Sequence, residues 1–187
     1  MSTTPELAAS TPKTRPGSTA EGPLALPEVH TKAFLLQVVQ PGLSGLMDGS
    51  LSTLAPIFAV ALATHRPLTA FYTGLATALG AGVSMAFSEG LSDPGEETGR
   101  GNPFVRGAIT GSGTFLGGVF HTLPFLIADF KAAIIAAVAV VAVELLVLAY
   151  LRYKFFRLSF ARSFVSVAVG GAIIAALSAA LGTAAAG

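Results

Sequence analysis

The chain of 187 residues is 52% hydrophobic and only 11% charged, with a formal net charge of +1. Soluble proteins average about 25% charged residues, so this composition excludes an ordinary water-soluble domain and favours lipid as the solvent. The basic residues are scattered beside apolar stretches and give no sign of nucleic-acid binding, while the absence of cysteine excludes disulfides and thiolate metal sites.

Two segments precede the apolar part of the chain. Residues 1–27 are rich in Pro, Ser, Thr and Ala without a periodic apolar pattern, which predicts a disordered tail. Residues 28–40 carry apolar side chains at helical spacing. We predict a short interfacial helix there that ends at Pro41, the alternative being a longer tail.

Five apolar stretches follow, each close to the ~20 residues that a helix needs to cross a bilayer. They cover residues 42–63, 68–91, 104–128, 132–151 and 164–186. Short polar segments separate them, and no strand-like alternation is visible, so helices are the only spanning structure that fits. We therefore expect an all-α, polytopic membrane protein in which residues 41–187 form one domain of five transmembrane helices.

The lysines and arginines predict the orientation of these helices, because positive charge concentrates on the cytoplasmic side. With the N-terminus inside, the cytoplasmic segments hold Lys13, Arg15, Lys32, Arg100, Arg106, Arg152, Lys154, Arg157 and Arg162. The opposite side holds only Arg66 and Lys131. We expect a cytoplasmic N-terminus and an outside C-terminus. The short loops and missing cysteine favour a bacterial inner membrane.

Asp48 lies about two turns into the first apolar stretch. A carboxylate at membrane depth costs about 2.5–3.5 kcal/mol, so it should face a cavity, a partner helix or a metal ion. Ser44 and Ser52 lie four residues to either side and share its helix face. The alternative is an aspartate that bonds a neighbouring helix for packing alone.

The second apolar stretch carries a row of residues at spacing four, which drifts slowly along one helix face. Its members are Thr73, Thr77, Ala81, Met85, Glu89 and Asp93. Carboxylate oxygen suits hard cations, and thioether sulfur adds preference for softer metals, so the mixture fits iron(II) or manganese(II). Met85 could equally fill a gap in the core. Glu89 and Asp93, with the nearby Glu96 and Glu97, could collect cations at a pore mouth or simply be solvated.

Two further ionisable groups lie in the later stretches. Glu144 stands amid Val, Ala and Leu in the fourth, where it could carry protons or be a neutral acid bonded to another helix. His121 lies near the outer end of the third, as an exit ligand, a proton relay or an interfacial residue. Zinc-protease, nucleophile-elbow and phosphate-loop motifs are missing, so we expect neither an enzyme nor a bound cofactor.

Small residues at spacing four predict close helix contacts in lipid. They occur as Gly45-x-x-x-Gly49, Gly107-x-x-x-Gly111 and Gly113-x-x-x-Gly117. The first pair brackets Asp48. We therefore expect a two-fold homodimer in which the first helices face each other and each supplies an Asp48.

Several of these segments resemble one known family. Residues 45–54, GLMDGSLSTL, and 82–89, GVSMAFSE, look like the first- and second-helix signatures of the vacuolar iron transporter family. Gly117-Gly118 followed by Pro124 is similar to its third helix. Residues 88–93, SEGLSD, and 98–101, TGRG, are most similar to the membrane domain of bacterial membrane-bound ferritin-like iron exporters.

The resemblance covers the chain from about Pro41 to its end. It implies a homodimer with a metal path between the two first helices, and proton-coupled export of iron(II) or manganese(II) from the cytosol. Asp48 and Met85 match family positions on that path. Thr77 stands where eukaryotic members can carry glutamate, and residues 92–103 replace a long metal-collecting domain. The ferritin-like domain of the bacterial exporters has no counterpart here.

We therefore expect a secondary transporter whose partners are the bilayer, divalent metal ions, protons and a second copy of the chain. Candidate metal ligands are Asp48, Met85, Glu89 and Asp93, and candidate pathway or proton-coupling residues are Asp48, Glu144, His121, Ser52 and Thr77. Protonation of Asp48 or Glu144 would release the ion. The alternative is a non-transporting membrane subunit whose intramembrane polar residues serve helix packing.

Overall fold

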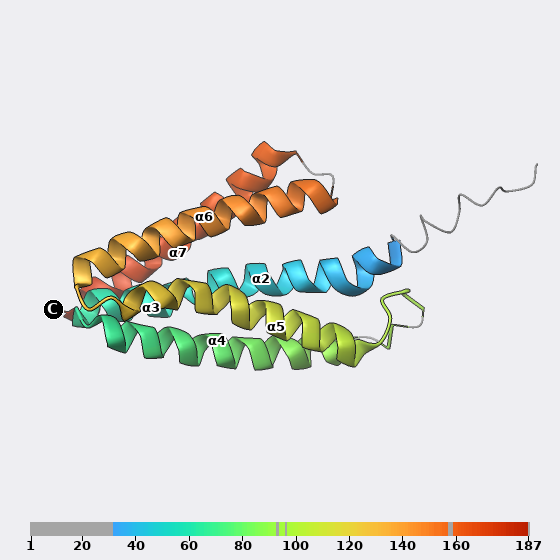
Figure 1. The fold of residues 1–187 in the computed structure, drawn as a ribbon, viewed down its shortest axis with the longest axis horizontal. Coiled ribbons are helices and arrows are strands. Elements are labelled where there is room, and N and C mark those ends of the chain that lie inside the picture. Colours follow the sequence, from blue (N-terminus) through green and yellow to red (C-terminus); the bar gives the residue numbers. More distant parts are fainter. Residues whose placement is uncertain (1–31, 93, 96, 157–158, 187) are drawn as a thin grey trace, which may run out of the picture.

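The computed structural model describes residues 32–92, 94–95, 97–156 and 159–186 (Figure 1). Throughout these residues the chain forms helices and turns and no strand, which confirms the predicted all-α class. The tail predicted for residues 1–27, and residues 28–31 of the predicted interfacial helix, lie outside the described part of the chain.

Within the described residues, four helices are long and apolar enough to cross a membrane. They are Lys32–Thr64, Pro67–Gly90, Phe130–Phe155 and Phe160–Ala185. The predicted third span corresponds to α5 (Pro103–Thr122) and the 3-10 helix η2 (Leu123–Leu126). Glycine and threonine occupy most of the buried face of α5, so it is less apolar than the other four.

The first helix runs without a break from Lys32 to Thr64, so the predicted helix end at Pro41 is wrong. A π-helical turn, η1 (Leu35–Val39), leads directly into α2 (Gln40–Ser52). In this turn the N–H of Gln40 donates to the carbonyl of Leu35. The wider turn lets the helix absorb Pro41, which has no N–H and would crowd a regular α-helical turn.

The helix continues as α3 (Leu54–Thr64), and Thr53 marks the junction. Pro56 cannot donate to the carbonyl of Ser52, four residues back. The Thr53 hydroxyl donates to the carbonyl of Gly49 at 2.7 Å, which supports the turn before the junction. Irregular helical geometry therefore follows within five residues of Asp48.

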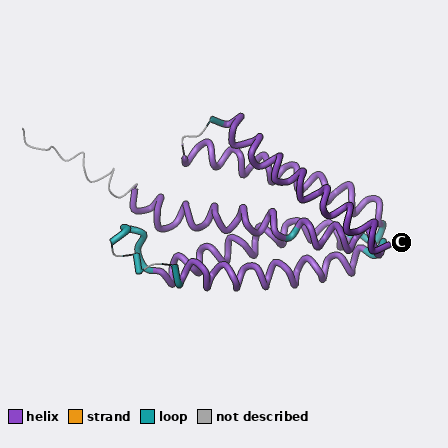
Figure 2. The backbone as a smooth tube through the Cα atoms, turned by 180° about the vertical axis from the view of Figure 1, so that it is seen from behind, coloured by secondary structure: helices purple, strands orange, loops and turns teal. Residues whose placement is uncertain are grey.

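The helices form two groups that meet at one end. In the first, α5 packs between α2 and α4 (Pro67–Gly90). In the second, α6 (Phe130–Phe156) and α7 (Phe160–Ala186) form an antiparallel pair (Figure 1). The two groups join through α3, which packs against α7 and α4, and through η2. At the other end α6 and α7 lie apart from α2 (Figure 2).

The core lies where the two groups join. Its buried members are Ile57, Ala61, Ala70, Phe125, Ala133 and Ala137, contributed by α3, α4, η2 and α6. The start of the first helix, the α4–α5 connection and the α6–α7 connection share the opposite end of the molecule (Figure 2). Six of the eight described lysines and arginines lie in these segments or in the helix ends that flank them, so the charge asymmetry used for orientation coincides with one end of the fold. They are Lys32, Arg100, Arg106, Arg152, Lys154 and Arg162.

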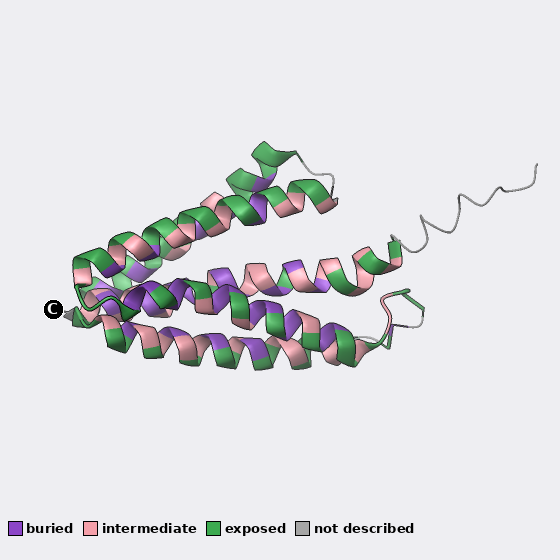
Figure 3. Cartoon of the chain, viewed as in Figure 1, coloured by how far each residue is buried: buried purple, intermediate pink, exposed green. Residues whose placement is uncertain are grey.

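The glycine pairs of the sequence are used inside the chain. A Cβ on Gly45 or Gly49 would overlap the backbone of α5 at Thr110 or Thr114. Gly107 and Gly111, on another side of α5, meet the backbone of α4 in the same way. Figure 3 shows the resulting buried residues along α5. The predicted tight packing is present, but the glycine face of α2 meets α5 and is not open to a second copy.

Candidate functional site

Three helices bring a carboxylate, an imidazole and a hydroxyl together in the interior. Nδ1 of His121, on α5, lies 2.7 Å from Oε2 of Glu144, on α6. Nε2 of the same ring lies 2.8 Å from the carbonyl oxygen of Ser50, on α2. The Ser50 hydroxyl contacts Oε1 of Glu144 and also donates to the carbonyl of Leu46 at 2.7 Å. We call these three residues the Ser50–His121–Glu144 cluster.

The side chains of the cluster are largely buried. Ser50 is 0% exposed, and the side chains of His121 and Glu144 are 1% and 13% exposed. An apolar groove of about 450 Å³, lined by α5 and α6 residues that include Phe120 and Val143, reaches Glu144 from the surface. The sequence placed Glu144 and His121 in separate helices without partners, whereas the structure pairs them.

Small residues allow α5 to come close enough for this contact. Gly117 lies against the α2 backbone at Leu46, one turn before Ser50, and a side chain there would overlap that backbone. Gly118 lies against Thr53 and Ala78. The adjacent glycines thus set the last turn of α5, which carries His121, between α2 and α4.

The arrangement differs from a hydrolytic triad. In a triad the imidazole contacts the hydroxyl of the serine and activates it as a nucleophile. Here the imidazole contacts the Ser50 backbone carbonyl, and the hydroxyl contacts the carboxylate instead. The imidazole is therefore not placed to take the proton of the Ser50 hydroxyl.

Asp48 occupies a different side of α2. Its side chain is half-buried, while Ser44 and Ser52, on the same helix face, are exposed. Asp48 forms no hydrogen bond or ion pair with another described residue. The neighbouring Met47 accepts a hydrogen bond at its sulfur from Arg152 of α6, at 3.8 Å. The Ser44–Asp48–Ser52 face is therefore open and partnerless within one copy of the described chain.

Met85 and Thr77, two further predicted site residues, lie on α4. Met85 is half-buried, and the Thr77 hydroxyl donates to the carbonyl of Thr73 at 2.8 Å. Asp93 and Glu96 lie outside the described residues. Among the residues that the structure describes, no three acidic or histidine side chains gather in a way that could hold a metal ion.

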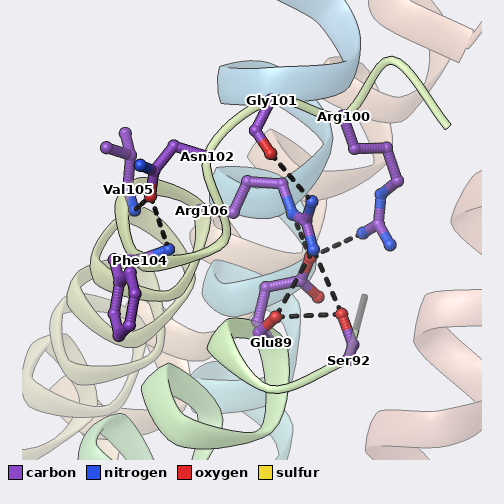
Figure 4. A network of polar contacts seen from close by, with 8 residues as sticks. All are labelled: Glu89, Ser92, Arg100, Gly101, Asn102, Phe104, Val105 and Arg106. Carbon is purple, nitrogen blue, oxygen red and sulfur yellow. Dashed lines mark hydrogen bonds and ion pairs between the residues drawn. The ribbon is translucent and has the colours of Figure 1, made fainter. Parts of the chain in front are cut away.

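Glu89 takes part in a network of charged groups at the junction of α4 and α5 (Figure 4). Its Oε1 accepts from Nε of Arg106 at 2.8 Å and from Nη2 of Arg100 at 2.6 Å. Arg106 is only 1% exposed and also donates to the hydroxyl of Ser92 at 3.1 Å. Glu89 is thus bound to two guanidinium groups, an arrangement that the metal-ligand prediction did not include.

The same junction positions the start of α5. The side chain of Asn102 caps the helix by accepting from the N–H groups of Phe104 and Val105 at 2.8 and 3.3 Å (Figure 4). Arg106 follows one turn later and reaches back to α4. Sequence reasoning counted Arg106 as a cytoplasmic charge that could balance the nearby acidic residues, and missed its burial.

Comparison of the chain with protein-family models, with curated proteins and with solved structures found no match in any of the three. The fold and the composition define a helical protein with helices able to span a membrane. Its function must be inferred from the chain's own residues.

Proposed function

We propose that this chain is a proton-coupled secondary transporter that moves iron(II) or manganese(II) out of the cytosol. The observation that carries the proposal is the buried contact between His121 and Glu144 within apolar helices. Ionisable groups at membrane depth are costly and commonly mark ion pathways and proton relays. A carboxylate and an imidazole in contact there can exchange a proton with little movement.

The metal would bind at the Ser44–Asp48–Ser52 face. Asp48 is half-buried and has no partner among the described residues, so its carboxylate is available to a cation. In a homodimer built on this face, each copy would supply an Asp48. Two such carboxylates cannot both stay ionised at low dielectric unless a metal ion or a proton neutralises them. Competition between the two would give antiport.

Met85 would add a soft ligand that favours iron(II) or manganese(II) over harder ions. The resemblance of residues 45–54 and 82–89 to vacuolar iron transporters supports this choice of metal. In this arrangement α5 is the fifth crossing, with its glycine- and threonine-rich face against α2 and α4 and the exposed Leu116 and Phe120 towards lipid. The N-terminus is in the cytoplasm and the C-terminus outside. The bacterial inner membrane is the proposed location.

Reconstitution into liposomes tests the proposal. Purified protein is placed in vesicles that enclose a metal-sensitive and a pH-sensitive dye, and iron(II), manganese(II), cobalt(II) and zinc(II) are compared. We expect iron(II) or manganese(II) flux, with protons moving in the opposite direction. Vesicles that show no metal flux above protein-free vesicles, under any imposed pH gradient, would exclude transport.

The second candidate is a membrane subunit that does not transport. It is favoured by one observation: Glu89 and Glu144 both have basic partners inside the chain, as helix-packing residues would. The flux measurement separates the two candidates, because a packing role predicts no metal movement. Asp48, which has no such partner among the described residues, favours transport.

A further inference from the structure

We infer that the Ser50–His121–Glu144 cluster is a proton-binding site that holds up to three exchangeable protons. When only one proton remains, the contact between Glu144 and His121 breaks. This inference deepens the proposed transport function and relies on it only for the use made of the proton. The inference itself stands on the distances among the three residues and on the donors and acceptors that they carry.

The imidazole fixes the first proton. The backbone carbonyl of Ser50 can only accept a hydrogen bond, so Nε2 of His121, 2.8 Å away, must carry a proton and donate. Nδ1 and Oε2 of Glu144 form an ion-pair contact at 2.7 Å without the direction of a hydrogen bond. Two unprotonated acceptors would repel at this distance, so one of the two groups must carry a proton. It belongs either to an imidazolium beside a carboxylate or to a carboxylic acid beside a neutral imidazole. Both descriptions contain two protons.

The hydroxyl provides a place for a third proton. Ser50 has a single hydroxyl hydrogen, which can be donated to the carbonyl of Leu46, 2.7 Å away, or to Oε1 of Glu144. When it is donated to Leu46, the hydroxyl oxygen can accept a hydrogen bond from a protonated Oε1. A carboxylic acid protonated at Oε1, beside an imidazolium, then supplies a hydrogen to each of the three hydrogen bonds and a proton to Nδ1. The cluster can therefore accept a proton without moving a side chain.

Removal of protons has the opposite effect. With one proton, on Nε2, the unprotonated Nδ1 would lie 2.7 Å from the ionised Oε2 of Glu144. Two acceptors at this distance repel, and an unpaired polar group in the interior costs free energy. This state would part Glu144 from His121 and loosen α6, which has no other described ion pair or side-chain hydrogen bond to α5.

Few other charges act on the cluster. The helices packed against α6 are α2, α5, α7 and η2. Apart from the cluster, the ionisable residues of these helices are Asp48, Arg106 and Arg162, and those of α6 itself are Lys131, Tyr150, Arg152, Tyr153 and Lys154. Asp48, two residues before Ser50, is the acidic one.

Spectroscopy without metal tests the site directly. The full-length protein in lipid vesicles is titrated between roughly pH 8 and 3, which covers the ordinary ranges of histidine and of carboxyl groups. Infrared difference spectra report a carboxylic acid, and nitrogen NMR of labelled histidine reports whether both ring nitrogens carry protons. We expect an acid band that develops while His121 is a doubly protonated imidazolium.

Three variants assign these signals. Glu144→Gln should abolish the band, because the amide keeps the hydrogen bonds but cannot take up a proton. Ser50→Ala should keep the band and shift its frequency, because the acid loses the oxygen to which it donates. Ser166→Ala removes a serine of α7 that bonds only a backbone carbonyl, of Arg162, and should change neither signal.

The inference is overturned if no acid band depends on Glu144, or if His121 is neutral whenever the acid is present. Neither measurement involves metal. Titration of the cluster without any flux in liposomes would therefore reject the proposed transport and retain the proton site. Proton-coupled flux with a cluster that does not titrate would reject the proton site and retain the proposed transport.

Discussion

Gly49 of α2 lies so close to Thr114 of α5 that a Cβ on the glycine would overlap the threonine carbonyl oxygen. The same relationship holds one turn earlier, between Gly45 and Thr110. Helices in lipid associate through close packing because no hydrophobic force drives them together. The two glycines therefore fix the position of α2, and with it the placement of Ser50 and Asp48.

Gly49→Ala is the first test of this packing. We expect it to destabilise the protein by about 1–3 kcal/mol, the usual cost of forcing a methyl group into a filled interface. The measurement is helix content against temperature in detergent micelles. Gly80→Ala is the matched control, because a Cβ on Gly80 of α4 meets nothing within 4 Å. Equal melting of the two variants would contradict the packing argument.

Arg106 provides the second test. Its guanidinium is 1% exposed and bonds Glu89, so Arg106→Gln removes a buried charge from its partner. We expect a loss of about 3 kcal/mol, towards the low end of values for breaking buried pairs because Glu89 is 18% exposed. Arg100→Gln, with a guanidinium 26% exposed, should cost under about 1 kcal/mol. The free energy of unfolding is measured by chemical unfolding in micelles. A larger loss for Arg100→Gln than for Arg106→Gln would contradict a structural role for Arg106.

Much of the fold could be predicted from the sequence. The apolar stretch at 68–91 became α4 (Pro67–Gly90), since stretches near the length of a bilayer crossing, separated by polar breaks, specify helices. The continuation through Pro41 could not be predicted, because it depends on the π-turn that precedes it. A hydropathy pattern carries no information on such local compensation.

Side-chain contacts between helices were harder to predict than the helices themselves. Spacing within one helix shows which residues share a face, but not which neighbour that face meets. It therefore grouped Asp48 with Ser44 and Ser52, yet missed Ser50 as a partner of Glu144. Glu89 and Arg106 could have been paired by counting outward from the short α4–α5 connection, because residues that flank a hairpin connection lie at the same level.

The open Ser44–Asp48–Ser52 face makes the third prediction. Because the chain contains no cysteine, single cysteines introduced at Ser44 and Ser52 can be crosslinked without a background. Both positions are exposed, and we expect disulfide-linked dimers in membranes. Leu177→Cys, exposed on α7, is the control that should stay uncrosslinked. Crosslinking at all three positions would indicate random collision, and none at Ser44 or Ser52 would contradict the homodimer.

The fourth prediction concerns the number of crossings. If α5 crosses the membrane with the four more apolar helices, the chain ends on the side opposite its start. A reporter fused after Gly187 should then be external, and one fused before Met1 cytoplasmic. A third fusion at residues 127–129, between η2 and α6, should also be external. A cytoplasmic reporter after Gly187 would mean that α5 does not cross.

The last prediction separates transport from packing at Asp48. The Asp48→Asn variant keeps the shape of the side chain but removes its charge and its proton, so it should abolish metal flux in liposomes. Folding should be nearly unaffected, because Asp48 has no hydrogen bond or ion pair to another described residue that the change could break. Met85→Leu keeps the volume and removes the sulfur, so it should reduce iron(II) flux more than stability and shift preference towards harder ions. Iron(II) transport by Asp48→Asn at the wild-type rate, with unchanged proton dependence, would show that this carboxylate serves packing and that the metal path lies elsewhere.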